Sequence, residues 1–240
     1  NGQALTGLPP RAMLNLLNQD LPGEIPLEIL RDGQIFPISM KKGKFSMDMI
    51  SEEDAISLHF FGEGICQELK EISAERATQP LVLDLRDNEG GLWDESIECI
   101  DLFLDENLLI GHRKMTDQTR IPILSKTKPI HQGQLIILVN QGTRGPAELF
   151  SLVLQEHKRA TLVGERTFGD AIDFQFYPLN EQWILKIAET EMLSADRYSW
   201  NKTGVTPDVS VSMYLDRPSY TPVPQTDIQL ETALRLMATD

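Results

Sequence analysis

The chain has 240 residues, enough for one substantial hydrophobic core and a small additional module. Its apolar content of 41% and charged content of 24% are typical of a globular protein. A net charge of -14 argues against a nucleic-acid partner, because phosphate contacts need clustered lysine and arginine. No apolar run reaches the roughly 18 to 20 residues that span a bilayer. No charged-then-apolar leader opens the chain, so we expect any export signal to lie upstream of Asn1.

The first part of the chain is typical of part of a small domain. Residues 9–18 carry apolar side chains at helical spacing behind a proline-marked start, which predicts a short helix. Residues 25–31 and 34–40 flank an Asp-Gly pair. This pair predicts a β-hairpin, because it supplies the positive φ angles of a two-residue turn. We predict one domain over residues 1–43 and a second over residues 44–240.

The second domain alternates apolar runs with helical patterns that follow glycine turns. Such an order predicts an α/β layered core rather than an all-α or all-β fold. We expect residues 45–54 to be an irregular or edge segment. The expected strands are residues 55–61, 81–85, 135–139, 161–163, 172–177, 183–189 and 209–213. The expected helices are residues 64–73, a segment with Ile97, Ile100 and Leu104 facing inward, a segment opening at Pro146, and residues 227–237.

One stretch has the form of an active site without its reactive groups. A short apolar strand ends at Val139, residues 142–145 make a turn, and Pro146 opens a helix. Enzymes often mount a nucleophile where such a turn meets its helix. Here Gly145 and Pro146 stand at that point, with no serine, cysteine or threonine.

Other candidate reactive residues fit structural roles. Cys66 and Cys99 fall within expected helices beside apolar residues, which predicts two buried thiols and leaves the redox compartment open. We interpret the four histidines as ordinary structural residues; they are His59, His112, His131 and His157.

The turn that follows the expected strand at residues 81–85 is charged and rich in glycine. Asp84 and Asp87 flank Arg86, which predicts an ion pair at the strand end. The Gly-Gly pair at residues 90–91 lacks the spacing and the lysine of a phosphate-binding loop. No His, Cys or carboxylate spacing resembles a metal site, so we predict neither a metal nor a cofactor.

These segments resemble the S41 peptidases, the carboxy-terminal processing or tail-specific proteases. LVLDLRDNEGG is similar to that family's strand and Asn-Pro-Gly-Gly turn, with Asp87 and Glu89 in place of its Asn and Pro. IILVNQGTRGPAELFSLVLQEHKRATLVGERTFGDA is similar to its nucleophile turn, helix and lysine segment, and WNKTGVTPDVSV to its closing signature. NGQALTGLPPRAMLNLL and IPLEILRDGQIFPISM resemble the second half of that family's PDZ domain.

The resemblance implies a ClpP/crotonase-like core beside a PDZ-like domain, an extracytoplasmic location and polypeptide ligands. It also implies a Ser-Lys dyad, in which a buried neutral lysine takes the proton of the serine. The family's serine position corresponds to Gly145 and its lysine position to Asp170. Its supporting glutamine corresponds to Phe174, with Gln175 one place later. On a strand, that shift turns the side chain to the opposite face.

The resemblance further implies an oxyanion hole made of two main-chain amides. One belongs to the residue after the serine, and Pro146 has no N–H to donate. Loss of one such donor elsewhere lowers rates about 100- to 1,000-fold. Gly90 or Gly91 would supply the other donor. The carboxylate of Asp170 is not the strong base that a serine hydroxyl needs.

Three hypotheses follow. The first is a peptidase-like protein that has lost Ser-Lys proteolysis and binds or regulates polypeptides, with Thr143 and Arg144 lining its pocket. In it, Asp170 either pairs with Arg144 or presents its carboxylate to a ligand. The second is a serine-type hydrolase that cleaves protein C-terminal regions through a non-standard nucleophile, such as Thr143 or a residue of a partner chain. The third is a crotonase-type acyl-thioester enzyme with its pocket at the Gly90 turn. The sequence leaves the oligomeric state open.

Overall fold

The computed structural model describes residues 24–31, 33–41, 50–52, 55–179, 183–213 and 227–238. The chain divides into two compact units, Asn1–Met47 and Asp48–Asp240. Within the described residues, no helix has both the length and the apolar character needed to cross a membrane.

The described part of the first unit is a β-hairpin. Strand β1 (Glu24–Arg31) pairs antiparallel with β2 (Gln34–Lys41), and Gly33 in the turn has a φ of 75°. The hairpin predicted at the Asp-Gly pair is therefore confirmed. The helix predicted at residues 9–18 lies outside the described residues, and the PDZ-like domain of residues 1–43 stays a prediction.

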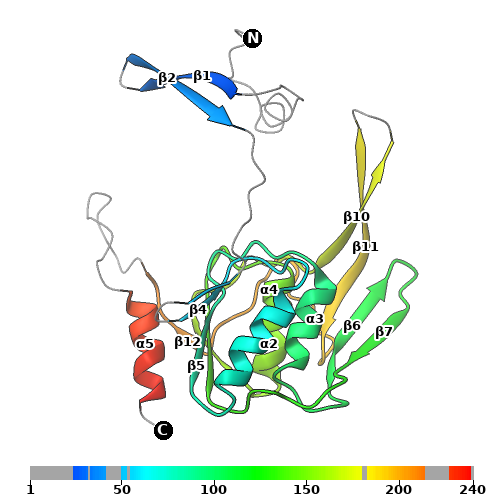
Figure 1. The fold of residues 1–240 in the computed structure, drawn as a ribbon. Helices are drawn as coiled ribbons and strands as arrows, with labels where there is room; N and C mark the ends of the chain where they lie inside the picture. Colours follow the sequence, from blue (N-terminus) through cyan, green and yellow to red (C-terminus); the bar gives the residue numbers. More distant parts are fainter. Residues whose placement is uncertain are drawn as a thin grey trace. The chain divides into compact units, whose positions relative to one another are not determined.

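The second unit contains a six-stranded sheet with the order β12 (Val209–Ser210), β9 (Thr161–Gly164), β8 (Leu135–Val139), β5 (Leu81–Asp84), β4 (Ile56–Leu58) and β3 (Ile50–Glu52) (Figure 1). All pairs of neighbours are parallel except β3 with β4. Strand β8 is buried along its whole length, as expected for a parallel sheet covered on both faces.

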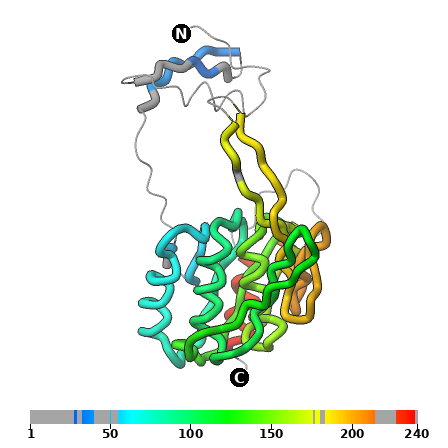
Figure 2. The backbone as a smooth tube through the Cα atoms, turned by 90° about the vertical axis from the view of Figure 1, so that its right-hand side faces the viewer, coloured from blue at the N-terminus to red at the C-terminus, as the bar shows by residue number. Residues whose placement is uncertain are grey.

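Among the described residues, four helices cover the faces of this sheet: α2 (Ile65–Glu75), α3 (Trp93–Asp101), α4 (Pro146–Glu156) and α5 (Ile228–Met237). Helices α2, α3 and α4 lie side by side on one face, and α5 lies on the other (Figures 1 and 2). Because strand side chains alternate between faces, Leu83 and Ile137 enter the larger core, while Val82 and Ile136 enter a smaller core with Ala233 of α5. The predicted α/β architecture is confirmed.

A four-stranded antiparallel sheet has the order β10 (Ile172–Pro178), β11 (Ile184–Ser194), β6 (Leu109–Met115) and β7 (Arg120–Leu124). The hairpin of β10 and β11, yellow in Figure 1, projects from this unit as an arm. The expected elements do not include β6 and β7, because the polar residues 112–114 obscure the apolar alternation. Strand β11 also continues past its predicted end at residue 189, since Met192 and Leu193 are buried in the pairing with β6.

Three other predicted boundaries are wrong in detail. The strand predicted at residues 55–61 ends with β4, and Phe61 forms only an isolated bridge with Gly91. Helix α3 ends before Leu104, which is buried beyond the helix. The strand predicted at residues 209–213 is limited to β12, because only its first two residues pair with β9.

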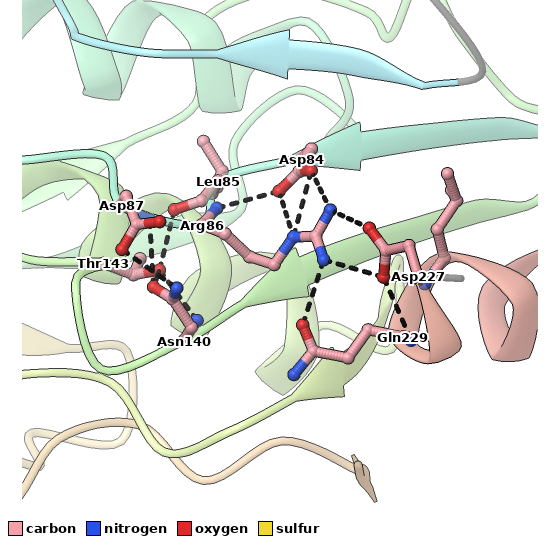
Figure 3. A network of polar contacts seen from close by, with 9 residues as sticks. Asp84, Leu85, Arg86, Asp87, Asn140, Thr143, Asp227 and Gln229 are labelled. Atoms are coloured by element: carbon pink, nitrogen blue, oxygen red, sulfur yellow. Dashed lines mark hydrogen bonds and ion pairs between the residues drawn. The ribbon is translucent and has the colours of Figure 1, made fainter. Parts of the chain in front are cut away.

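One arginine joins α5 to the carboxyl end of β5 (Figure 3). The guanidinium of Arg86 contacts the carboxylate of Asp84 through Nε at 2.9 Å and Nη2 at 2.5 Å. The same guanidinium contacts Asp227, the N-cap residue of α5, at 2.6 and 2.9 Å. The predicted strand-end ion pair is therefore formed by Asp84. Asp87 instead exchanges hydrogen bonds with the side chain of Asn140.

Replacing Arg86 by methionine should leave two partly buried carboxylates without their counterion. We expect Arg86→Met to lower the free energy of unfolding by about 2–3 kcal/mol, because Asp84 and Asp227 would then repel each other. Chemical denaturation followed by circular dichroism measures this loss. Arg113→Met is the matched control: its partner Asp94 is 81% exposed, so its loss should stay below about 1 kcal/mol. Equal losses in the two variants would contradict the prediction.

The contribution of Arg86 should also depend on pH. Burial disfavours the charged form of Asp227, but the hydrogen bond and attraction of Arg86, together with hydrogen bonds from the main-chain N–H groups of Leu230 and Gln229, lower the pKa of Asp227. A carboxyl group with a lowered pKa stabilises the fold above its unfolded-state pKa of about 3.9, and this contribution is lost as the pH falls through the folded-state pKa. The stability difference between wild type and Arg86→Met should therefore shrink below about pH 4. A difference that stays constant from about pH 7 to about pH 3 would show that Arg86 acts by another route.

Candidate functional site

Two turns meet at the carboxyl edge of the parallel sheet, where open α/β sheets commonly bind ligands. One turn follows β5, and the other joins β8 to α4. The buried side chain of Asn88 donates to the carbonyl of Leu58 at 2.7 Å and accepts from the N–H of Gly90 at 2.8 Å. Its main-chain carbonyl accepts from the N–H of Arg144 at 3.0 Å. Asn88 therefore holds the two turns together.

Gly145 stands at the junction between the second turn and α4. Its φ of 57° and ψ of -122° lie in a region that residues with a Cβ rarely adopt. A Cβ built at this position would have the carbonyl oxygen of Asp170 as its nearest neighbour, at 4.0 Å. The backbone thus has the sharp strand-to-helix form that presents a nucleophile in other enzymes, with open space where a side chain would stand.

Within the described ranges, one main-chain N–H near Gly145 has no hydrogen-bond acceptor. Pro146 has no N–H, and its ring packs closely on the first turn: a Cβ on Gly90 would lie 3.0 Å from Pro146 Cδ. The N–H of Gly90 is already bonded to Asn88. Among the described residues, the structure shows no acceptor for the N–H of Gly91. Gly91 is therefore the residue of this pair whose amide can meet a ligand.

The buried carboxylate of Glu148 fastens the loop before β10 to this turn. Its Oε2 accepts from the N–H of Gly145 at 3.0 Å and of Asp170 at 2.7 Å. Its Oε1 accepts from the N–H of Gly169 at 2.7 Å and from the hydroxyl of Thr167. Burial raises the pKa of Glu148, while these hydrogen bonds act in the opposite direction. Glu148 is not among the site residues predicted from the sequence. An acidic residue at the third position of a helix is the signal for such a contact.

Asp170 meets the turn through its main chain, because its N–H donates to Glu148. Its Oδ1 accepts from the N–H of Ile172 at 3.4 Å, at the start of β10. The expected ion pair with Arg144 is not formed: the Cζ of Arg144 lies 3.9 Å from the centroid of the Phe168 ring. Arg144 belongs to no salt bridge within the described part of the chain.

Strand β10 is irregular at the expected glutamine position. Its register with β11 shifts between Asp173 and Phe174, which marks a bulge. Phe174 is half-buried, and the Nζ of Lys186 lies 3.9 Å from its ring centroid. Gln175 is exposed on the arm. The bulge means that sequence spacing alone does not fix which of Phe174 and Gln175 faces the turn.

Thr143 is a structural residue of the second turn. It is fully buried, and its hydroxyl donates to the carbonyl of Leu85 at 2.7 Å and accepts from the N–H of Asn140 at 3.0 Å. The hydroxyl of Thr143 is therefore not presented as a nucleophile, and it does not line an accessible pocket.

Two of the histidines make structural contacts. The imidazoles of His131 and His157 form hydrogen bonds with main-chain carbonyl groups, at 2.9 and 2.8 Å.

The two cysteines are free and buried, as predicted. Burial raises the pKa of the Cys99 thiol, and a hydrogen bond with Cys66 adds to this effect. The Cys99 thiol is therefore a protonated core group of low reactivity. No group of three His, Cys, Asp or Glu side chains within the described ranges is arranged to hold a metal ion.

A sharp turn between a strand and a helix, set against a glycine turn at the carboxyl edge of a parallel sheet, places the chain in the class of α/β proteins whose sites lie at that edge. Residues 55–211 match peptidase family S41. The chain belongs to this family, and the resemblance drawn from its motifs is confirmed at the family level.

Relatives in sequence are C-terminal processing proteases. A probable CtpA-like serine protease of Staphylococcus haemolyticus (strain JCSC1435) is 26% identical over 222 residues, which are 88% of this chain and 45% of that protein. A carboxy-terminal-processing protease of Bartonella bacilliformis is 33% identical over 156 residues, which are 61% of this chain and 35% of that protein. The chain thus spans less than half the length of these curated relatives.

Solved structures share the fold. The photosystem II D1 C-terminal processing protease aligns with a TM-score of 0.62 and 20% identity, over 90% of this chain and 60% of that one. A putative S41 protease from Bacteroides fragilis NCTC 9343 aligns with a TM-score of 0.63 and 19% identity, over 90% and 65% of the two chains. At identities of 20% and 19%, the structural likeness establishes only the shared fold, which combines a parallel and an antiparallel sheet. It is not an argument about activity.

Glu148→Gln should loosen the turn. The new amide group would place N–H donors against main-chain N–H donors, so we expect a loss of about 2–4 kcal/mol in the free energy of unfolding. Amide hydrogen exchange at Gly145, Gly169 and Asp170 should accelerate. Glu156→Gln is the control, because that carboxylate accepts one main-chain N–H, from Ala195 at 3.2 Å, and its loss should be smaller. A Glu148→Gln variant as stable as the control would overturn this role.

Gly145→Ser should fit the space at the turn without creating a hydrolase. We expect a loss of about 1–2 kcal/mol from the positive φ angle. We expect no adduct with a fluorophosphonate probe, because no side chain of the described residues lies within 4 Å of a Cβ at this position and Pro146 donates no amide. Denaturation and intact-protein mass spectrometry test both points. Gly145→Ala should show the same loss of stability, and labelling confined to the serine variant would reveal a base that the structure does not show.

Proposed function

We propose that this member of family S41 binds polypeptides and does not cleave them with a Ser-Lys dyad. The turn at Gly145 carries this proposal. Its backbone is shaped to present a nucleophile, yet Gly145 has no reactive side chain, Pro146 has no amide hydrogen, and Asp170 stands at the position corresponding to the family's lysine.

Each of these three changes removes a different part of the chemistry. Covalent catalysis needs a nucleophile, proton transfer needs a base, and the tetrahedral intermediate needs amide donors. One inactivating substitution would remove one part only. Because all three parts are altered within a preserved frame, we infer a protein that uses the frame for binding.

Polypeptide ligands are the part of this proposal that family membership supports most directly. We further propose that the layered core is of the ClpP/crotonase type, that residues 1–43 are part of a PDZ-like domain, and that the protein is extracytoplasmic. The two enzymatic alternatives have less support. The hydroxyl of Thr143 is bonded to Leu85, and the N–H of Gly90, which a thioester carbonyl would need, is bonded to Asn88.

The test combines binding and cleavage on the 240-residue chain. We expect immobilised protein to retain unfolded casein, whereas casein in solution stays intact over the time that an active S41 peptidase needs to degrade it. A fluorophosphonate probe should leave no adduct. Gly145→Ser/Pro146→Ala/Asp170→Lys, which restores nucleophile, amide and lysine together, should be labelled by the probe.

Two results would contradict the proposal. Cleavage or labelling of the wild-type chain would show a surviving hydrolase, with a nucleophile from this chain or from a second copy. Failure of the wild type to retain casein, with correct folding shown by circular dichroism, would remove the binding function.

A further inference from the structure

The parallel sheet has a cavity of about 570 Å³ at its amino edge, the edge opposite the two turns. The lining of this cavity includes the first residues of β8 and β9, Leu135 and Thr161. Small-molecule sites commonly have volumes of roughly 300–1,000 Å³. The lining also contains two basic residues, Lys158 and Arg159, and one carboxylate, that of Asp105. We call this space the amino-edge cavity.

Arg159 is a half-buried cation whose hydrogen-bond partners are all neutral. Its Nε donates to the carbonyl of Phe103 at 3.2 Å, and its Nη2 donates to Nδ1 and to the carbonyl of His131 at 2.8 and 2.9 Å. It belongs to no salt bridge within the residues that the structure describes. Burial lowers the pKa of Arg159, because the charged form loses hydration. Such a cation favours an anion in the adjacent cavity.

His131 orients the guanidinium without neutralising it. The Nε2 of His131 lies 2.9 Å from the carbonyl of Gln79, which can only accept, so Nε2 carries the hydrogen. Nδ1 is then the unprotonated nitrogen that accepts from Arg159. The ring is buried, and burial lowers the pKa of His131, which favours this neutral form. Arg159 therefore keeps its charge and is held in one direction.

The donors that remain on Arg159 favour a phosphate group over a carboxylate. A guanidinium binds a carboxylate through two parallel N–H groups, and both of its forks include Nη2. The two hydrogens of Nη2 are already donated to His131, so neither fork is available. Nη1 has no acceptor among the described residues. Nη1 and the ammonium group of Lys158 suit separate oxygens of a tetrahedral anion.

We propose that the amino-edge cavity binds a small phosphate monoester, with Arg159 Nη1 and Lys158 contacting the phosphate oxygens. The carboxylate of Asp105 in the same lining repels a second phosphate and can accept a hydrogen bond from a hydroxyl group. The ligand class is therefore a hydroxylated molecule that carries one phosphate. This inference is independent of the proposed polypeptide binding, because it concerns the other edge of the sheet.

Isothermal titration calorimetry on the 240-residue chain at neutral pH tests the inference. The probes are glycerol 3-phosphate, inorganic phosphate and glycerol, with sodium chloride at matched ionic strength as the salt control. We expect glycerol 3-phosphate to bind with a dissociation constant below about 1 mM, and inorganic phosphate to bind about three- to tenfold more weakly. Glycerol and sodium chloride should give no saturable heat.

Variants assign the binding to named side chains. Lys158→Gln removes an exposed cation and should weaken glycerol 3-phosphate binding about fivefold or more without unfolding the chain. Arg159→Gln should weaken it at least about tenfold, with folding checked by circular dichroism. Arg166→Gln is the matched control, because Arg166 is an exposed arginine just after the carboxyl end of β9, and its affinity should equal that of the wild type.

Asp105→Asn distinguishes binding in this cavity from general attraction to basic residues. Loss of its negative charge should strengthen inorganic phosphate binding about two- to fivefold, because a repulsion is removed. The advantage of glycerol 3-phosphate over inorganic phosphate should shrink at the same time. A purely structural role of Asp105 would change neither affinity.

Three results would overturn the proposal. Absence of saturable binding for both phosphate compounds would remove the site. Unchanged affinity in Lys158→Gln and in folded Arg159→Gln would place the phosphate elsewhere. Equal affinities for inorganic phosphate and glycerol 3-phosphate would contradict the choice of a monoester in favour of the free anion. None of these results bears on retention of casein, so the proposed function is tested separately.

Discussion

The arrangement of the site depends on the buried carboxylate of Glu148. A carboxylate in the interior needs hydrogen-bond donors in place of water, and it finds three main-chain N–H groups and a hydroxyl. These donors come from the turn at Gly145 and from the loop that leads into β10. One side chain therefore determines how the helix start and the loop approach each other, although it takes no part in any chemistry that we infer.

Two further polar groups act at the same edge of the sheet. Asn88 joins the turn after β5 to the turn before α4, and Arg86 joins the end of β5 to α5 across Asp227. Each of them connects segments that are far apart in sequence. The apolar core decides which faces of strands and helices are buried, whereas these three polar residues decide how the loops at the edge are positioned. The geometry of the turn at Gly145 therefore depends on these polar contacts as well as on the apolar core.

Much of the fold was predictable because its signals are local. The apolar run of β8 and the Asp-Gly pair between β1 and β2 specify their structures over a few residues. The correspondence of Gly145 and Asp170 with the family's serine and lysine rests on motif spacing and stays a prediction. The pairing of β6 and β7 did not, nor did the stacking of Arg144 on Phe168, because both depend on partners brought together only by the folded chain. Spacing placed Arg144 and Asp170 near each other but left the directions of their side chains open.

Gly145 and Pro146 also affect the stability of the turn. A residue with a Cβ would be strained at a φ of 57°, and glycine relieves that strain. Proline at the first helical position restricts the unfolded chain and offsets part of the freedom that glycine adds to it. Gly145 and Pro146 therefore both ease folding of the turn. A reactive side chain at position 145 would have to be held at a positive φ angle, at a cost in stability that glycine does not incur.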